Sequence, residues 1–547
     1  MKTLNKKPSG TEQNSPTTTQ RRLLFAGLIV ALIVLRAVGL ALPTVFWWIA
    51  TRNQKNRKYP VILTRIQGAE VILTLLSAIA ALGREGIYGF VESIAQSSTI
   101  FLAINFYGGI VYFILQWKKL DLGNILRGTK LAKNSEDLQK DLNRRHQEHL
   151  ERSSRTEMLP RLSIGGVKLP AYLEDLGIFT IGSPGSGKSQ AIARLLSELK
   201  QRPDFRVVVF DRNGEMTENC YDERRDLIFN PVDARSLLWS HKTEQARPET
   251  IAAGLIPDFS KEPFFNDAAR NLLSDLYERC DNNAEIWGTL TTLTTEELKN
   301  FVAGGLSQRY FISEKTGGSV LSSLINYVRF YKELPDEGEK FSFVEWARDG
   351  DSRSLFLPLF EEDSELFKPL YSMVFELILK GLLSNEGRQI KTAIVIDELG
   401  ALNKLNSLAR LLSESRKFGG CPILGTQAGA QVKKVYGDED FDILLQTTKT
   451  KLILNCPDPT TALIGAELIG KVERRELNTT YSGMFGLNRS RSESIRETYA
   501  VMPSEIQALP KLEGYLLIAD GTSPSKVRIT PQSYPTVAKR LIRRDTP

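Results

Sequence analysis

The chain has few of the residues that build disulfides and metal centres, with 4 cysteines and 3 histidines among 547 residues. No two cysteines form a C-x-x-C pair, which favours buried thiols in a reducing compartment over disulfides or a zinc site. His146 and His149 have H-x-x-H spacing, but their stretch is charged and offers no further ligand, so we interpret it as a solvated helix face. No Ser–His–Asp or Cys–His set can be assembled, which argues against nucleophilic hydrolase chemistry.

The chain also lacks a strong excess of either charge. Lys and Arg outnumber Asp and Glu by 71 to 64, and the sequence pI is about 9.0. This mild basicity favours nucleic acid or anionic lipid as a partner without requiring either. A length of 547 residues exceeds what one hydrophobic core usually supports, so several domains are expected.

Two long apolar runs near the N-terminus predict a transmembrane region at 21–117, with spans at about 23–49 and 99–116. Residues 1–20 are polar and predict a disordered cytoplasmic tail. Basic residues flank both runs and also occupy the loop between them, so the positive-inside rule leaves the topology ambiguous. We favour a hairpin of two spans with its loop outside, and a three-span arrangement is the alternative.

A glycine-rich stretch at 182–189 matches G-x-x-x-x-G-K-[ST] at every fixed position. An apolar run leads into it, and apolar residues behind it recur with helical spacing, which is the context of a phosphate-binding loop. Lys188 would reach the β- and γ-phosphates and the Ser189 hydroxyl would bind Mg²⁺. A glycine-rich surface turn is the weaker alternative. The nucleotide-binding candidates in this loop are Gly182, Ser183, Pro184, Gly185, Ser186, Gly187, Lys188 and Ser189.

A second apolar strand is expected at 206–210, and a third, at 393–396, runs into Asp397 and Glu398. This is a Walker B pattern, in which Asp397 would hold the Mg²⁺ shell and Glu398 would act as the base that polarises water. The alternative is a carboxylate pair that caps the following helix. The chain has no N-K-x-D motif for reading guanine, so ATP is expected rather than GTP.

Two further candidates follow the Walker B pattern. A strand at 422–425 leads to Gln427, which is well placed to sense the γ-phosphate. Arg416 ends an amphipathic helix and is either a finger for a neighbouring subunit's nucleotide or a cation that complements the helix C-terminus. On spacing alone the two roles of Arg416 are equally supported.

We predict an α/β protein with an inserted all-α domain. A linker is expected at 118–162. The nucleotide-binding domain is expected at 163–232 and 341–532, because apolar strands recur there almost to the end. Residues 233–340 are rich in helix-forming segments with apolar faces, which indicates the all-α domain. Residues 533–547 form a basic tail.

Several motifs resemble those of the TraD type of conjugative coupling protein, within the RecA-like hexameric DNA pumps that include TrwB and FtsK. The motifs are FDRNGE at 210–215, NPVDARSLLW at 230–239, IDELGALNKL at 396–405, ESRKFGGC at 414–421, GTQAGAQVKKVYG at 425–437 and YAVMPSEIQALPKLEGYL at 499–516.

The resemblance implies a RecA-like P-loop NTPase in the bacterial inner membrane, multi-pass, with its ATPase domain cytoplasmic. It implies a homo-hexamer with ATP at subunit interfaces, in which Arg416 matches the arginine finger and Gln427 the γ-phosphate sensor. The implied partners are DNA, relaxase and other relaxosome proteins, and the type IV secretion channel. Relaxosome docking would use the all-α domain, the linker or the basic tail, since no long acidic extension follows residue 547.

Four hypotheses follow. The chain is a motor that moves single-stranded or double-stranded DNA, with salt-sensitive phosphate contacts. Alternatively, it is a membrane-anchored receptor whose ATPase gates the channel or passes protein substrates. A third hypothesis is an FtsK-like translocase that works in chromosome segregation, which the two spans and the TraD-like motifs weigh against. The last is a scaffold with a degenerate engine, against which the intact Lys188, Asp397, Glu398 and Gln427 argue.

Overall fold

The computed structural model describes residues 79, 86, 125–153, 159–257, 263–335, 338–349, 351–387, 389–482 and 488–544, with the backbone alone at 476–482 and 488–493. The chain divides into two units, Met1–Asn124 and Ile125–Pro547, and the elements below belong to the second. The predicted spans at 23–49 and 99–116 lie outside the described residues. Within the described ranges, no helix combines the length and apolar character needed to cross a bilayer.

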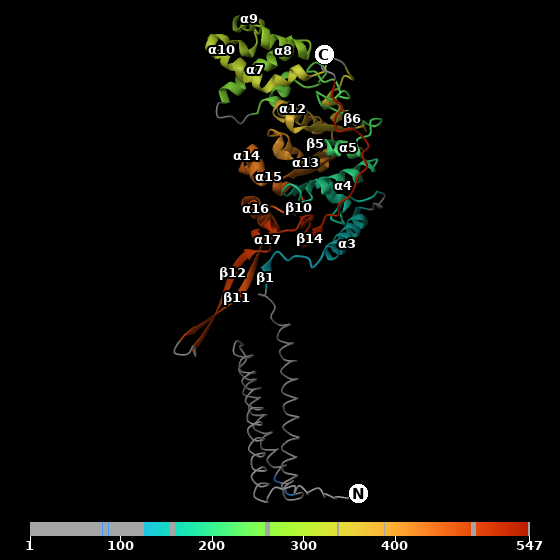
Figure 1. Cartoon of the computed structure of the whole chain (residues 1–547), viewed down its shortest axis with the longest axis vertical. Coiled ribbons are helices and arrows are strands. Elements are labelled where there is room, and N and C mark those ends of the chain that lie inside the picture. Colours follow the sequence, from blue (N-terminus) through green and yellow to red (C-terminus); the bar gives the residue numbers. More distant parts are fainter. Residues whose placement is uncertain are drawn as a thin grey trace, which may run out of the picture. The chain divides into compact units, whose positions relative to one another are not determined.

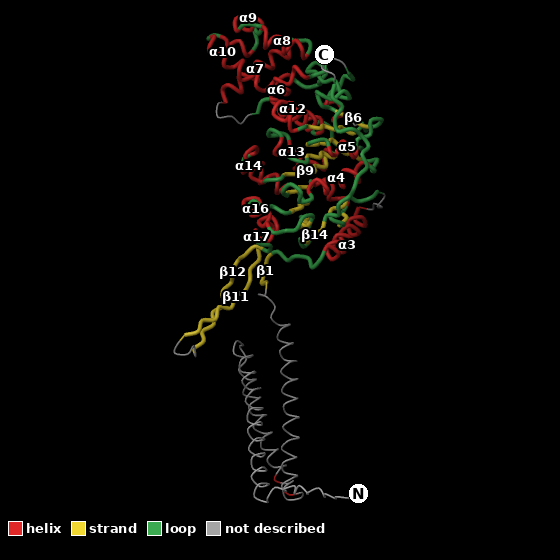
Figure 2. Tube along the Cα trace, in the orientation of Figure 1, coloured by secondary structure: helices red, strands yellow, loops and turns green. Residues whose placement is uncertain are grey.

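A nine-stranded sheet forms the centre of the second unit, in the order β14-β13-β10-β4-β9-β8-β5-β7-β6. Figure 2 draws its strands in yellow, with helices in red around them. The strands from β10 to β6 are parallel, and β13 and β14 join the edge antiparallel. Parallel strands end at one edge, so the segments after β4, β5, β8 and β9 meet there. The strands are β4 Ile178–Ile181, β5 Phe205–Arg212, β6 Asp226–Ile228, β7 Ser354–Leu359, β8 Lys391–Ile396, β9 Gly420–Thr426, β10 Thr450–Leu454, β13 Glu513–Ile518 and β14 Ser525–Arg528.

Helices cover both faces of this sheet. Successive side chains of a strand point to opposite faces, and β5 follows that rule: Val207 and Val209 lie in one buried cluster with α4, while Val208 and Phe210 lie in the other with α12 and α13. Strands buried on both faces read as continuous apolar runs, which is why β4, β5 and β8 could be predicted. The helices around the sheet are α3 Ser135–Ser153, α4 Lys188–Lys200, α5 Glu215–Cys220, α12 Ser364–Leu382, α13 Leu408–Phe418, α14 Gly429–Tyr436, α15 Asp438–Thr447, α16 Pro459–Ile469 and α17 Pro503–Gln507.

Between β6 and β7 the chain makes a helical excursion at the end of the unit away from β11 (Lys471–Ser482) and β12 (Asn488–Tyr499) (Figure 1). Local signals set its helix starts: the Asn282 side chain caps α8, and Thr294 with Glu297 forms a capping box on α9. The buried core of these helices is continuous with that of one sheet face, including Trp239 and Phe229. The excursion comprises α6 Pro248–Leu255, α7 Pro263–Arg279, α8 Asn283–Thr292, α9 Thr295–Phe301, α10 Glu314–Val328 and α11 Phe343–Asp349.

A separate sheet of three strands, β1-β11-β12, lies at the opposite end of the unit (Figure 1). Its strands are β1 Ile125–Gly128, β11 Lys471–Ser482 and β12 Asn488–Tyr499. Glu473 lies opposite Glu497 and Arg474 opposite Arg496, so charged residues occupy both faces of the hairpin. These strands could not be predicted from the sequence, because their residues show no apolar alternation.

The last described residues run as an extended segment against the α/β core. The backbone N–H of Val537 donates to the carbonyl of Glu218 at 2.8 Å, and Arg540 forms an ion pair with the Glu218 carboxylate at 2.6 Å. Farther along, the backbone of Ile542 accepts from Ala234 at 2.8 Å. The basic run at 539–544 is therefore partly engaged with the chain's own core.

Candidate nucleotide site

The turn between β4 and α4 places the predicted phosphate-binding loop at the carboxyl edge of the sheet, and α4 begins at Lys188. Gly187 has φ 110°, and a Cβ there would lie 2.9 Å from Leu512 Cδ2. At Gly182, an added Cβ would lie 2.5 Å from Ser186 Oγ. The loop therefore requires glycine at these two positions, both of which the motif specifies.

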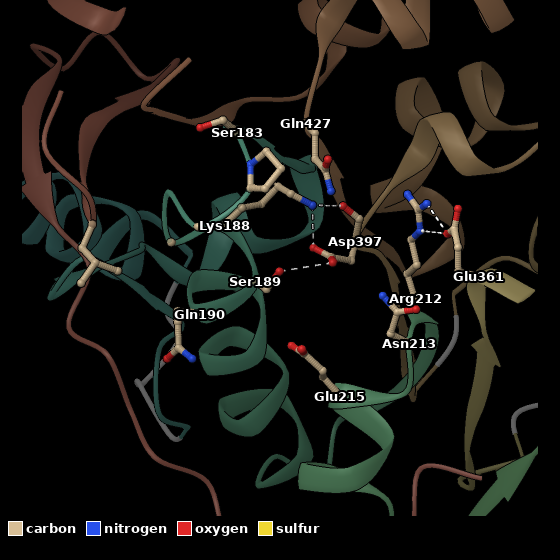
Figure 3. A pocket seen from close by; sticks show the side chains of 14 residues that line it. Ser183, Lys188, Ser189, Gln190, Arg212, Asn213, Glu215, Glu361, Asp397 and Gln427 are labelled. Carbon is tan, nitrogen blue, oxygen red and sulfur yellow. Dashed lines mark hydrogen bonds and ion pairs between the residues drawn. The ribbon is translucent and has the colours of Figure 1, made fainter. Parts of the chain in front are cut away.

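Lys188, Ser189 and Asp397 converge although more than 200 residues separate the loop from Asp397 (Figure 3). Lys188 Nζ donates to Asp397 Oδ1 at 2.8 Å and also to the Asp397 backbone carbonyl. Ser189 Oγ donates to Asp397 Oδ2 at 3.3 Å. The fold thus gathers a lysine ammonium, a hydroxyl and a carboxylate, which are the groups that bind phosphate and Mg²⁺.

Glu398 is buried directly behind this group, with 1% of its side chain exposed. Its carboxylate accepts from Thr426 Oγ1 at 3.1 Å and from the backbone N–H of Gln427 at 3.1 Å, and Lys188 Nζ lies 3.7 Å away. Burial raises the pKa of Glu398, and Lys188 and the two donors oppose that rise. A carboxyl whose pKa is moved towards neutrality is suited to general-base chemistry.

A cavity of about 570 Å³ opens over the loop, within the size range of small-molecule sites. Its wall combines the loop with the ends of β5, β8 and β9 and with the turn before β13. The lining residues are Ser183, Pro184, Gly185, Gly187, Lys188, Ser189, Gln190, Arg212, Asn213, Glu215, Glu361, Asp397, Gln427 and Leu512.

Arg416 is the one predicted catalytic residue that lies away from this group. It is exposed in the last turn of α13, beyond which Gly419 forms the C-cap in a left-handed conformation (φ 65°). Neither Arg416 nor Glu398 lines the cavity, but Glu398 lies against Lys188. The structure therefore brings together Lys188, Asp397, Glu398 and Gln427 within one chain, and not Arg416.

Six cavity residues had no role in the sequence prediction: Gln190, Arg212, Asn213, Glu215, Glu361 and Leu512. Among residues of described structure, Asn213 (φ 70°) and Leu512 (φ 67°) are the non-glycine residues with positive φ. Such strain clusters at functional sites. The motif at 210–215 marked part of this wall, but its contact with Glu361 depends on the pairing of β5 with β7.

Asp211 directly precedes the cavity residues Arg212 and Asn213 in the chain, and its carboxyl is fully buried. It accepts from the backbone N–H of Thr217 at 2.6 Å and from Thr217 Oγ1 at 2.7 Å. Burial raises its pKa to about 6, and the negative charge of Asp397 adds to that rise. Asp211 therefore anchors α5 beneath the cavity.

Residues 161–530 match the family model described as the type IV secretion-system coupling protein DNA-binding domain. Coupling protein TraD of Escherichia coli (strain K12) is 29% identical over 468 residues, which cover 80% of this chain and 63% of TraD. The chain thus spans less than two thirds of that relative's length.

Solved structures of TrwB share the fold at 24% identity. The unbound monoclinic form of the bacterial conjugative coupling protein TrwBdeltaN70 has a TM-score of 0.66 and covers 77% of this chain and 96% of its own. The plasmid coupling protein TrwB in complex with ADP and Mg²⁺ has a TM-score of 0.64, with 77% and 97% covered. The predicted α/β NTPase fold is confirmed.

Proposed function

The chain belongs to the type IV secretion-system coupling protein family, and on that premise we propose that it is an ATP-driven motor of conjugative DNA transfer. In this proposal it recruits the relaxosome and passes the relaxase-bound single strand to the secretion channel. The spans at 23–49 and 99–116, outside the described residues, anchor it in the bacterial inner membrane with the ATPase domain in the cytoplasm.

The observation that supports ATP hydrolysis most directly is the convergence of Lys188, Ser189 and Asp397 on one cavity. The loop N–H groups and Lys188 bind the phosphates, because a helix N-terminus and an ammonium both attract anions. The Ser189 hydroxyl and the Asp397 carboxylate are hard oxygen ligands of the kind Mg²⁺ prefers. Bound Mg²⁺ would supply charge neutralisation to the phosphates.

Glu398 and Gln427 supply the remaining chemistry from the same chain. The Glu398 carboxylate accepts the proton of the attacking water, and its raised pKa suits that role. Gln427 lines the cavity through its side chain, while its backbone N–H holds Glu398. One residue at the tip of β9 therefore links the γ-phosphate to the position of the base.

Arg416 acts on a neighbouring subunit's nucleotide in a homo-hexameric ring. Its exposure on α13, away from its own chain's cavity, supports a role in trans. A guanidinium delivered by a neighbour stabilises the charge of the transition state. Turnover then requires assembly, and DNA that threads the ring stimulates it.

DNA-stimulated ATP hydrolysis by the full chain in detergent micelles tests this proposal. We expect single-stranded DNA to raise turnover, and Lys188→Ala and Arg416→Ala each to abolish it. Arg410→Ala is the matched control, because Arg410 is exposed on the same helix and pairs with Glu414. Turnover that ignores DNA but responds to a relaxase or a channel protein would contradict the motor and support the receptor alternative.

A further inference from the structure

Arg212 ends β5 at the edge of the sheet where the phosphate-binding loop and the Walker B carboxylates meet. β5 pairs with β8 in parallel register, Phe210 opposite Ile396, so the next residues of the two strands emerge side by side. Arg212 lines the same cavity as Lys188 and Asp397. In the view of Figure 3, Asp397 lies between the Lys188 ammonium and the Arg212 guanidinium.

The partner of Arg212 is an exposed carboxylate on the cavity wall. Arg212 Nη2 and Nε donate to Glu361 Oε2 at 2.5 and 3.2 Å. Glu361 is the first residue of the short 3₁₀ turn Glu361–Asp363 after β7, and its side chain is 69% exposed. Exposed ion pairs contribute little to stability, so a phosphate with more negative charge can displace this carboxylate. A guanidinium also matches phosphate geometry through two parallel donors.

The backbone after Arg212 is held in an unusual conformation. Asn213 and Gly214 both have left-handed φ, 70° and 72°, which costs free energy at the non-glycine residue. The Asn213 N–H donates to the Leu359 carbonyl at 3.1 Å. At Gly214, an added Cβ would lie 3.0 Å from Arg540 Cβ and 3.2 Å from Phe360 Cζ. The turn is therefore tightly confined, which fixes where Arg212 leaves the strand.

From this geometry, and resting on the proposed ATPase function, we propose that Arg212 contacts the terminal phosphate of ATP from within the same chain. Glu361 is the counter-ion that Arg212 exchanges for that phosphate. The loop and Lys188 hold the phosphates from one wall, with Lys188 at the β- and γ-phosphates. A cation at the wall beyond Asp397 meets the terminal phosphate from its other side. Arg212 thereby distinguishes ATP from ADP.

A purely structural role makes a different prediction. If Arg212 only tied the turn at Glu361 to β5, then Arg212→Ala and Glu361→Gln would break the same ion pair with the same consequence. If Arg212 binds the terminal phosphate, the two changes shift the affinity for an ATP analogue in opposite directions. Arg212→Ala removes the guanidinium, whereas Glu361→Gln frees it for the phosphate. Comparing these variants therefore separates the two roles.

The experiment measures binding of Mg²⁺-ADP and of a non-hydrolysable Mg²⁺-ATP analogue to the full chain in detergent micelles. Arg212→Ala is expected to weaken the analogue by about tenfold or more, the size of one charge-assisted hydrogen bond, with ADP affinity little changed. Arg212→Lys recovers part of the loss. Glu361→Gln keeps ADP affinity and tightens the analogue. Glu362→Gln is the matched control, since Glu362 pairs with Arg543 and is absent from the cavity lining.

Equal weakening of ADP and analogue by Arg212→Ala would overturn the inference, as would weakening of the analogue by Glu361→Gln. Matched thermal unfolding of the variants shows that each is folded. A wild-type chain that binds neither nucleotide would instead overturn the proposed ATPase function itself, so the two failures are distinguishable.

Discussion

Removing the Lys188 ammonium should destabilise the nucleotide-free protein as well as abolish nucleotide turnover. The Lys188 side chain is 5% exposed, and its two carboxylate neighbours, Asp397 and Glu398, are 15% and 1% exposed. Lys188→Ala therefore leaves two largely buried carboxylates without their cation. Truncating one partner of a buried charge group costs more than the group contributes while intact.

The distances set the scale of this effect. At an effective dielectric constant of about 20, the 2.8 Å contact to Asp397 has a Coulomb energy of about 6 kcal/mol and the 3.7 Å contact to Glu398 about 4.5 kcal/mol. The cost of desolvating the lysine offsets much of this sum, and Glu398 can take up a proton once Lys188 is gone. We therefore expect a net loss of about 3 kcal/mol in Lys188→Ala.

Urea unfolding of wild type, Lys188→Ala, Asp397→Asn and the double variant checks this value. Each single variant loses the same Lys188–Asp397 ion pair. The double variant should therefore be about 2 kcal/mol more stable than the sum of the two single losses predicts. Lys526→Ala, which breaks an exposed pair with Glu513, should cost less than about 1 kcal/mol. Single losses that add without coupling, or a Lys188→Ala variant as stable as wild type, would show that Lys188 does not stabilise the two carboxylates.

Three further predictions concern the same site. Gly187→Ala should lower stability by about 1–3 kcal/mol in thermal unfolding, because φ is 110° and Leu512 Cδ2 would lie 2.9 Å from the new Cβ; an unchanged midpoint would contradict it. Burial raises the pKa of Asp211 to about 6. The protonated carboxyl therefore contributes about 3 kcal/mol to the free energy of unfolding, which is fully present below pH 3.8 and is lost as pH rises through 6. Asp211→Asn should remove that pH dependence in urea titrations, and a variant with the wild-type dependence would argue against this source. Glu398→Gln should lower turnover by about 10²–10⁴ with nucleotide binding retained; in wild type the acid limb of the pH–rate profile should lie above pH 4.5, because the pKa of Glu398 is raised.

The residues of the site that could be predicted are those whose signal is local. Lys188 and Ser189 belong to a motif of fixed spacing between a strand and a helix, and Asp397 follows an apolar run long enough to mark a buried strand. Their meeting follows from one rule, that parallel strands end at the same edge of a sheet. These features need no knowledge of which strands are neighbours.

The rest of the cavity wall depends on tertiary pairing. Arg212 contacts Glu361 only because β7 returns beside β5 after the helical excursion. No local sequence pattern around either residue predicts this contact. β7 was also missed, since its six residues include Pro358, which usually argues against an inner strand. For Arg416 the information lies outside one chain, because its proposed ligand belongs to a neighbouring subunit.

We propose that this chain is a DNA-driven ATPase whose active sites are shared between subunits. Mixing two inactive variants tests it most directly, because Lys188→Ala retains Arg416 and Arg416→Ala retains Lys188. On mixing the full-length variants with single-stranded DNA, we expect ATP hydrolysis to return at interfaces that combine an intact Lys188 with a neighbour's Arg416. A mixture that stays inactive would contradict the shared site, and so would an Arg416→Ala variant that alone hydrolyses ATP at the wild-type rate.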